Sequence, residues 1–107
     1  MTKIEQREFL LKQAWIGDAV LCLFAREKIL REGGSVDGEK YTRLTSNQFL
    51  SGLGEPSEVE ARIGRVYEAK GLAAAFAFIE DEVVPLFTKQ EANRERSGAH
   101  PPRAGRR

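Results

Sequence analysis

Residues 14–25 read AWIGDAVLCLFA, and this stretch decides the fold. Its apolar residues recur at the three- and four-residue spacing of a helix with a buried face, and Asp18 is its one charged residue. A carboxylate in so apolar a segment is costly unless it is paired, caps a helix or binds a cation. The stretch therefore predicts either a buried helix that carries one functional acid, or a helix that restarts with Asp18 as its N-cap.

Helical spacing continues on both sides of this stretch, and no segment alternates as a confident strand would. Thr2 and Glu5 have the spacing of a capping box, so they are expected to open the first helix. This helix should end near Arg31, because Gly33 and Gly34 follow. Three further helices are expected, over residues 37–53, 56–70 and 72–87. The sequence predicts an all-α domain of about four helices.

The end of the chain differs in composition from the rest. Residues 88–107 hold 6 Lys and Arg against 2 Asp and Glu, whereas residues 1–87 hold 11 against 14. Because the end has almost no large apolar side chain, we expect a domain over 1–87 and a disordered basic tail over 88–107. No apolar run approaches the roughly 20 residues of a membrane span, and the N-terminus lacks the apolar core of a secretory signal. The single cysteine, Cys22, excludes an intramolecular disulfide, and we expect a cytoplasmic protein.

A second acid, Glu60, lies on the expected third helix, one turn before Gly64. A glycine at that spacing leaves a notch where another helix can approach closely. Gly17 would supply the matching notch beside Asp18, so we expect the first and third helices to cross here and bring the two acids together. Two neighbouring carboxylates favour a shared cation, and Mg²⁺ is the usual occupant. The alternative is that Glu60 is an ordinary solvated helix residue.

Three segments resemble the ribonuclease III family, and they occur in the family's order. Residues 15–30, WIGDAVLCLFAREKIL, are similar to the signature helix with its L-G-D-A-V core. Residues 44–54, LTSNQFLSGLG, are similar to the following helix with its L-V-S-N pattern. Residues 59–87 begin VEARIGRVY and resemble the F-E-A-L-I-G-x-x-Y stretch and the closing helix. The start of the chain is most similar to the mini-ribonuclease III branch, whose members lack a double-stranded-RNA-binding domain.

The resemblance implies a homodimer that cleaves double-stranded or structured RNA, for example a ribosomal RNA precursor. It implies Mg²⁺ as the cofactor, for which Mn²⁺ can substitute, and Asp18 and Glu60 as the catalytic residues that bind it. The family has two further carboxylates, at positions occupied here by Ala14 and Ser57. The chain is also shorter than its relatives between the second and third helices, where they carry a further helix and a basic loop that helps to grip RNA.

RNA binding would depend on cationic side chains that neutralise phosphates. The candidates are Lys40, Arg43, Arg62, Arg65, Arg94 and Arg96, and for each the alternative is an ordinary surface charge. Two other functions fit the sequence. One is a catalytically impaired ribonuclease III-fold dimer that binds RNA or a ribonucleoprotein, which Ala14, Ser57 and the shortening favour. The other is a helical dimerisation module with no RNA role, which the acidic composition of residues 1–87 favours.

Overall fold

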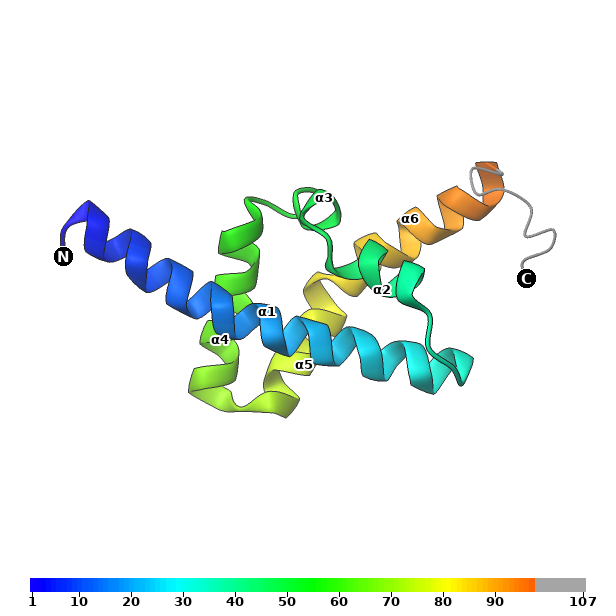
Figure 1. Cartoon of the computed structure of the whole chain (residues 1–107), viewed down its shortest axis with the longest axis horizontal. Helices are drawn as coiled ribbons and strands as arrows, with labels where there is room; N and C mark the ends of the chain where they lie inside the picture. The colour runs from blue at the N-terminus through cyan, green and yellow to red at the C-terminus, as the bar shows by residue number, and fades with distance from the viewer. Residues whose placement is uncertain (98–107) are drawn as a thin grey trace.

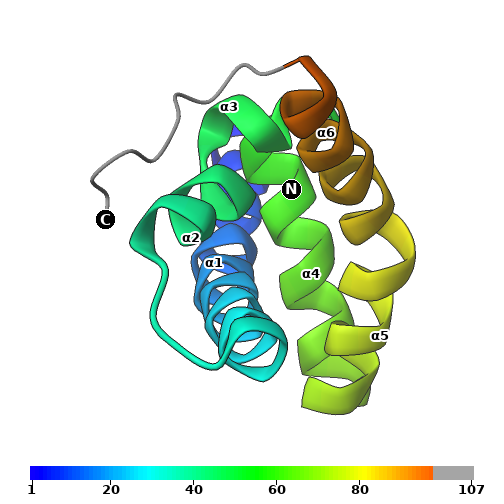
Figure 2. The ribbon, with the colours of Figure 1, turned by 90° about the vertical axis from the view of Figure 1, so that its right-hand side faces the viewer.

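The computed structural model describes residues 1–97, and these residues are helical with no strand, which confirms the all-α class. The helices are α1 (Lys3–Gly33), α2 (Gly38–Thr45), α3 (Asn47–Leu50), α4 (Pro56–Lys70), α5 (Leu72–Glu82) and α6 (Val84–Ser97). The long helix α1 follows the longest axis, and α4 crosses it (Figure 1). Seen end-on, α4 lies between α1 and the α5–α6 pair (Figure 2).

Helix α1 begins and ends as the sequence predicts. Thr2 and Glu5 form the capping box: the Thr2 N–H donates to Glu5 Oε1 at 2.8 Å, and the Glu5 N–H donates to Thr2 Oγ1 at 3.1 Å. Gly34 ends the helix in the left-handed conformation, with φ of 80°. The helix is unbroken at Asp18, so the alternative in which Asp18 caps a restarted helix is wrong. Although α1 has 31 residues, neither it nor another helix within residues 1–97 is apolar enough to cross a membrane.

Two of the expected helices are each divided, so the prediction of about four helices is wrong. The expected second helix breaks at Ser46, where the backbone is extended. The Ser46 side-chain oxygen accepts a hydrogen bond from the Phe49 N–H at 3.1 Å, so Ser46 is the N-cap of α3. The expected fourth helix breaks at Val83, two residues before Pro85. Proline has no N–H and clashes with the carbonyl four residues earlier, so it belongs in the first turn of α6 rather than inside one long helix.

Helix α6 extends to Ser97, so the prediction of disorder from residue 88 is wrong over 88–97. The rest of the predicted tail, residues 98–107, lies outside the described residues. Although α6 has few large apolar side chains, an ion pair holds it to α2. Arg43 donates to both carboxylate oxygens of Glu91, at 2.8 and 3.0 Å. Because this segment is also rich in strong helix formers, the domain continues beyond residue 87.

The core lies between α1, α4 and α5 and continues beneath α2, α3 and α6. Its largest fully buried side chains are Leu21, Leu44, Leu50, Ile63, Ile79 and Val83. Two edge-to-face aromatic pairs join distant elements: Phe24 with Phe76 at 5.3 Å, and Phe49 with Phe87 at 5.6 Å between ring centroids. Each buried side chain of this size stabilises the fold by about 1.5–3 kcal/mol. This core holds α1 and α4 in the crossing that positions the candidate site.

Candidate functional site

Helices α1 and α4 cross with their backbones in contact at two glycines. A Cβ atom placed on Gly17 would lie 1.7 Å from the carbonyl oxygen of Glu60. A Cβ atom placed on Gly64 would lie 2.1 Å from the carbonyl oxygen of Gln13. Neither position can hold a larger residue without separation of the helices. The crossing expected from the two glycines is therefore confirmed.

The crossing brings Asp18 of α1 and Glu60 of α4 into direct interaction, and both side chains are half-buried. The pKa of Glu60 is raised to about 7, chiefly by burial and further by a hydrogen bond to Asp18 and the negative charges of Asp18 and Glu55. Burial and the neighbouring negative charge disfavour the ionised form of Glu60, so near neutral pH Glu60 is partly protonated. Glu60 is therefore not an ordinary solvated residue, and the predicted meeting of the two acids is confirmed.

A row of polar groups leads from this acid pair to α2. The Cys22 thiol donates to Asp18 Oδ1 at 3.8 Å. Tyr41 follows, and a hydrogen bond to Cys22, together with burial, raises the pKa of its phenol. The guanidinium of Arg26 lies 5.0 Å from the centre of the Tyr41 ring. The spacing of Cys22, one helical turn after Asp18, could have revealed its place in the site, whereas nothing in the sequence places Tyr41 there.

The two positions at which the resemblance expects further carboxylates provide none. Ala14 is buried at 4% exposure in α1, and Ser57 lies in the first turn of α4. The carboxylate of Glu55 accepts from the Ser57 N–H at 3.0 Å and so caps α4. In residues 1–97, no group of three or more His, Cys, Asp and Glu side chains could hold a metal ion. The pair alone offers hard oxygen ligands, so a bound Mg²⁺ would keep several waters, as this ion commonly does.

Two of the predicted RNA-binding residues are engaged in ion pairs. Arg43 is half-buried and makes the bidentate pair with Glu91. The Lys40 Nζ atom lies 3.7 Å from Glu32, which also accepts from Lys28 at 2.6 Å. A cation that is already paired adds less attraction for RNA phosphates. The structure therefore weakens the case for Arg43 and Lys40 as primary RNA contacts.

The other four predicted RNA-binding residues are more available. Arg62 and Arg65 are exposed on α4, and Arg65 donates to the side-chain oxygen of the buried Gln13 at 3.2 Å. Arg94 and Arg96 lie on the last turns of α6, so they are held on a helix and not in a disordered tail. Arg62 and Arg65 are the cations nearest in sequence to Glu60. None of these four arginines forms an ion pair with Asp18 or Glu60.

In comparisons with known proteins, no family model, no curated protein and no solved structure matched the chain. The fold class and the geometry of the α1–α4 crossing stand on the structure alone. The resemblance to ribonuclease III stays a prediction from the motifs within residues 15–87.

Proposed function

We propose that the protein is a cytoplasmic, magnesium-dependent endoribonuclease of the mini-ribonuclease III type that cleaves double-stranded or structured RNA. The observation that carries this proposal is the α1–α4 crossing, which brings together Asp18 and Glu60, 42 residues apart in the chain. An acid pair whose burial and mutual repulsion raise a pKa to about 7 destabilises the fold unless a cation or a proton joins it. Such shifts cluster at functional sites.

Asp18 and Glu60 would hold the divalent ion from α1 and α4, with Mg²⁺ or Mn²⁺ suited to their oxygen ligands. When bound, the ion would lower the pKa of an attacking water and stabilise the leaving oxygen of a phosphodiester. The chain itself positions the two carboxylates through the glycine crossing. The hydrogen bond from Cys22 at 3.8 Å further orients the Asp18 side chain.

Cleavage of a perfect RNA duplex by the purified full chain tests this proposal. The assay compares the wild type with Asp18→Asn and Glu60→Gln, in Mg²⁺ and in Mn²⁺, on denaturing gels. The matched control is Glu58→Gln, an exposed acid on the same helix. We expect cleavage by the wild type and the control and none by the two site variants. Full activity in either site variant would refute the assignment.

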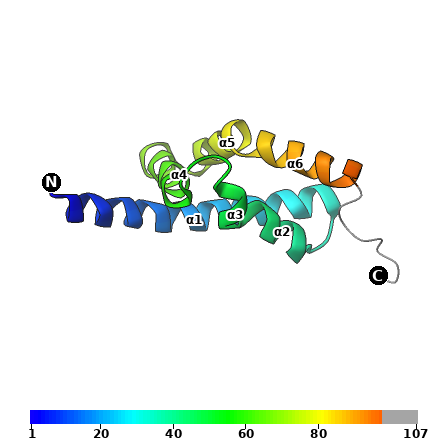
Figure 3. The same ribbon diagram turned by 90° about the horizontal axis from the view of Figure 1, so that it is seen from above.

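An exposed apolar stripe on α1 supports the homodimer that is part of the proposal. Ile4, Leu11 and Trp15 are 75%, 44% and 79% exposed, and their spacing places them on one face of the helix. The first turns of α1 project beyond α4, as Figure 1 and the view from above in Figure 3 show. Exposed apolar stripes of this kind mark interaction surfaces. Light scattering should report a dimer for the wild type and a monomer for Trp15→Glu, and a monomeric wild type at micromolar concentration would contradict the dimer.

A non-catalytic dimer that binds RNA or a ribonucleoprotein is the second candidate function. The buried Ala14 and the hydroxyl of Ser57 favour it, because they leave two acids where the ribonuclease III pattern has four. The cleavage assay separates the two functions. Binding of the duplex that weakens with salt, without cleavage in either metal, would support the second candidate.

A further inference from the structure

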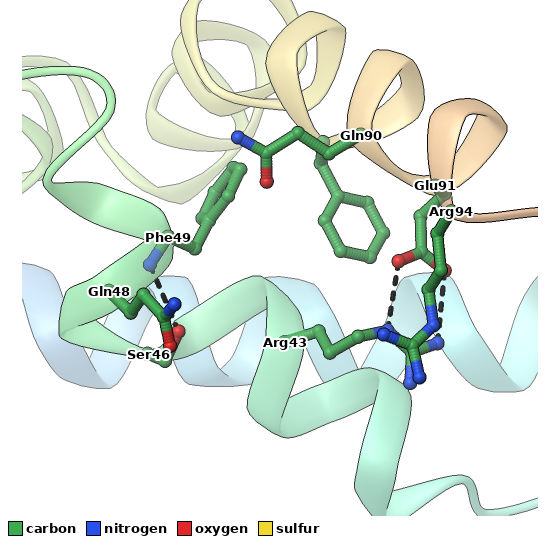
Figure 4. A pocket seen from close by; sticks show the side chains of 8 residues that line it. Arg43, Ser46, Gln48, Phe49, Gln90, Glu91 and Arg94 are labelled. Carbon is green, nitrogen blue, oxygen red and sulfur yellow. Dashed lines mark hydrogen bonds and ion pairs between the residues drawn. The ribbon is translucent and has the colours of Figure 1, made fainter. Parts of the chain in front are cut away.

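A polar cleft of about 380 Å³ lies between α2, α3 and α6. Neither Asp18 nor Glu60 lines it, so it is separate from the acid pair. Figure 4 shows Arg43, Glu91 and Arg94 at one end of the cleft and Gln90 reaching over it toward Phe49. We propose that this cleft is a second binding site, and that its ligand is a phosphate group. This inference does not depend on the proposed nuclease activity.

The charge of the cleft favours an anion. Glu91 is the only carboxylate that lines it, and both of its oxygens already accept hydrogen bonds from Arg43. Arg94 adds a second guanidinium to the same wall. Because Arg43 and Glu91 neutralise each other, the residues that line the cleft carry a net charge of +1. Arginine is the side chain whose planar donors best match the oxygens of phosphate.

The donors of the cleft are unused within the part of the chain that the structure describes. Among residues 1–97, the side chains of Gln48, Gln90 and Arg94 make no hydrogen bond to another residue. Each carries amide or guanidinium N–H groups, and all three face one concave surface. A ligand rich in acceptor oxygens would satisfy these donors together, as phosphate does.

The floor of the cleft is a packed aromatic pair. The rings of Phe49 and Phe87 pack edge to face at 5.6 Å, and both side chains are buried. The Arg43–Glu91 pair joins α2 to α6 across one end. The pair fixes the Arg43 guanidinium, so its remaining N–H groups lose less conformational entropy when a ligand binds. The cleft is also larger than a phosphate ion, so it leaves room for a group that carries the phosphate.

The phosphate group belongs either to a small phosphomonoester or to an RNA backbone. Titrations of the full chain, monitored in ¹H–¹⁵N NMR spectra, distinguish these two sources. Three probes are added separately: inorganic phosphate, adenosine 5′-monophosphate and a short RNA duplex with hydroxyl ends. Sodium chloride at matched ionic strength controls for charge screening. We expect phosphate to shift amide signals of α3 and α6. Shifts of the same signals by the monophosphate alone identify a small ligand, and shifts by the duplex identify an RNA backbone.

Variants test whether the named side chains make the site. Arg94→Gln should weaken phosphate binding by about tenfold or more, because it removes a charge-assisted hydrogen bond. Gln90→Ala should weaken it by about threefold through the loss of a neutral one. Arg7→Gln, an exposed arginine on α1, is the matched control and should leave binding unchanged. The proposal is overturned if none of the three probes shifts α3 or α6 beyond the chloride control, or if Arg7→Gln weakens binding as much as Arg94→Gln.

Discussion

Replacement of Gly17 by alanine tests the α1–α4 crossing directly, because it adds one methyl group at a backbone contact. The added Cβ would lie 1.7 Å from the Glu60 carbonyl oxygen, whereas ordinary contact begins at 3.4 Å. The obstructing atom belongs to the backbone and cannot rotate away. Helix α4 must therefore move by roughly the missing distance, about 1.7 Å, and the contacts on both sides of the crossing must loosen.

The size of the effect follows from two opposing contributions. Overpacking of a close-packed region costs about 1–3 kcal/mol, and more when the backbone has to move. Alanine regains about 1 kcal/mol of helix propensity relative to glycine. Because the backbone has to move, we expect a net loss near the upper end of this difference, about 1–2 kcal/mol in the free energy of unfolding, which lowers Tm by roughly 5–15 °C in a domain of this size. The same movement separates Asp18 from Glu60, so the raised pKa of Glu60 should fall toward its ordinary value.

Gly33→Ala is the matched control on the same helix. A Cβ atom at Gly33 would meet nothing within 4 Å, so this variant should gain up to about 1 kcal/mol from helix propensity alone. Thermal and urea unfolding followed by circular dichroism measure both variants, and the Glu60 carboxyl carbon signal followed by NMR reports its titration. The two substitutions should change stability in opposite directions. A Gly17→Ala protein as stable as Gly33→Ala would refute the backbone contact.

Two further predictions concern charges. Glu60 has a pKa of about 7 in the folded protein, and in the unfolded chain its pKa is near the ordinary value of 4.5. The wild type should therefore lose stability as the pH rises between these two values. At pH 8, Glu60→Gln should be more stable than the wild type by about 1–2 kcal/mol, after allowance for solvent screening. Urea unfolding at pH 5 and pH 8 measures this, and an equal difference at both pH values would contradict it. A double-mutant cycle of Arg43→Ala and Glu91→Ala should give a coupling free energy of about 1 kcal/mol in unfolding. Each variant should also show faster amide hydrogen exchange in α6. A coupling free energy of zero would count against the ion pair as the anchor of α6.

The α1–α4 crossing and the meeting of the two acids were predictable from the sequence. Glycine is costly inside a helix, and a close approach of another backbone is the main physical reason to tolerate it. Gly17 and Gly64 each lie within one turn of an acid, so the crossing that they allow also brings Asp18 near Glu60. The capping box at the start of α1 was predictable for a similar reason, since it depends on residues three positions apart.

The breaks between helices and the extent of α6 were not predictable from the same signals. Ser46 could equally lie inside a helix, and only its bond to the Phe49 N–H makes it an N-cap. Pro85 was visible in the sequence, but its place in a first or a last turn depends on how the flanking apolar residues pack. The ion pair that holds α6 joins residues 48 positions apart, and such a pair leaves no local pattern.

A structural role for the acid pair and a functional one predict different outcomes for the same substitution. If the ionised Glu60 served only to stabilise the fold, its replacement by the neutral glutamine would lower stability at pH 8. The raised pKa indicates the opposite, because burial and the Asp18 charge disfavour the ionised Glu60 above neutral pH. Strain of this kind persists at sites where a ligand relieves it, and its removal commonly stabilises a protein while it abolishes activity. A Glu60→Gln protein that is more stable at pH 8, and that no longer gains thermal stability from added Mn²⁺ as the wild type does, would show that the pair exists to bind a cation.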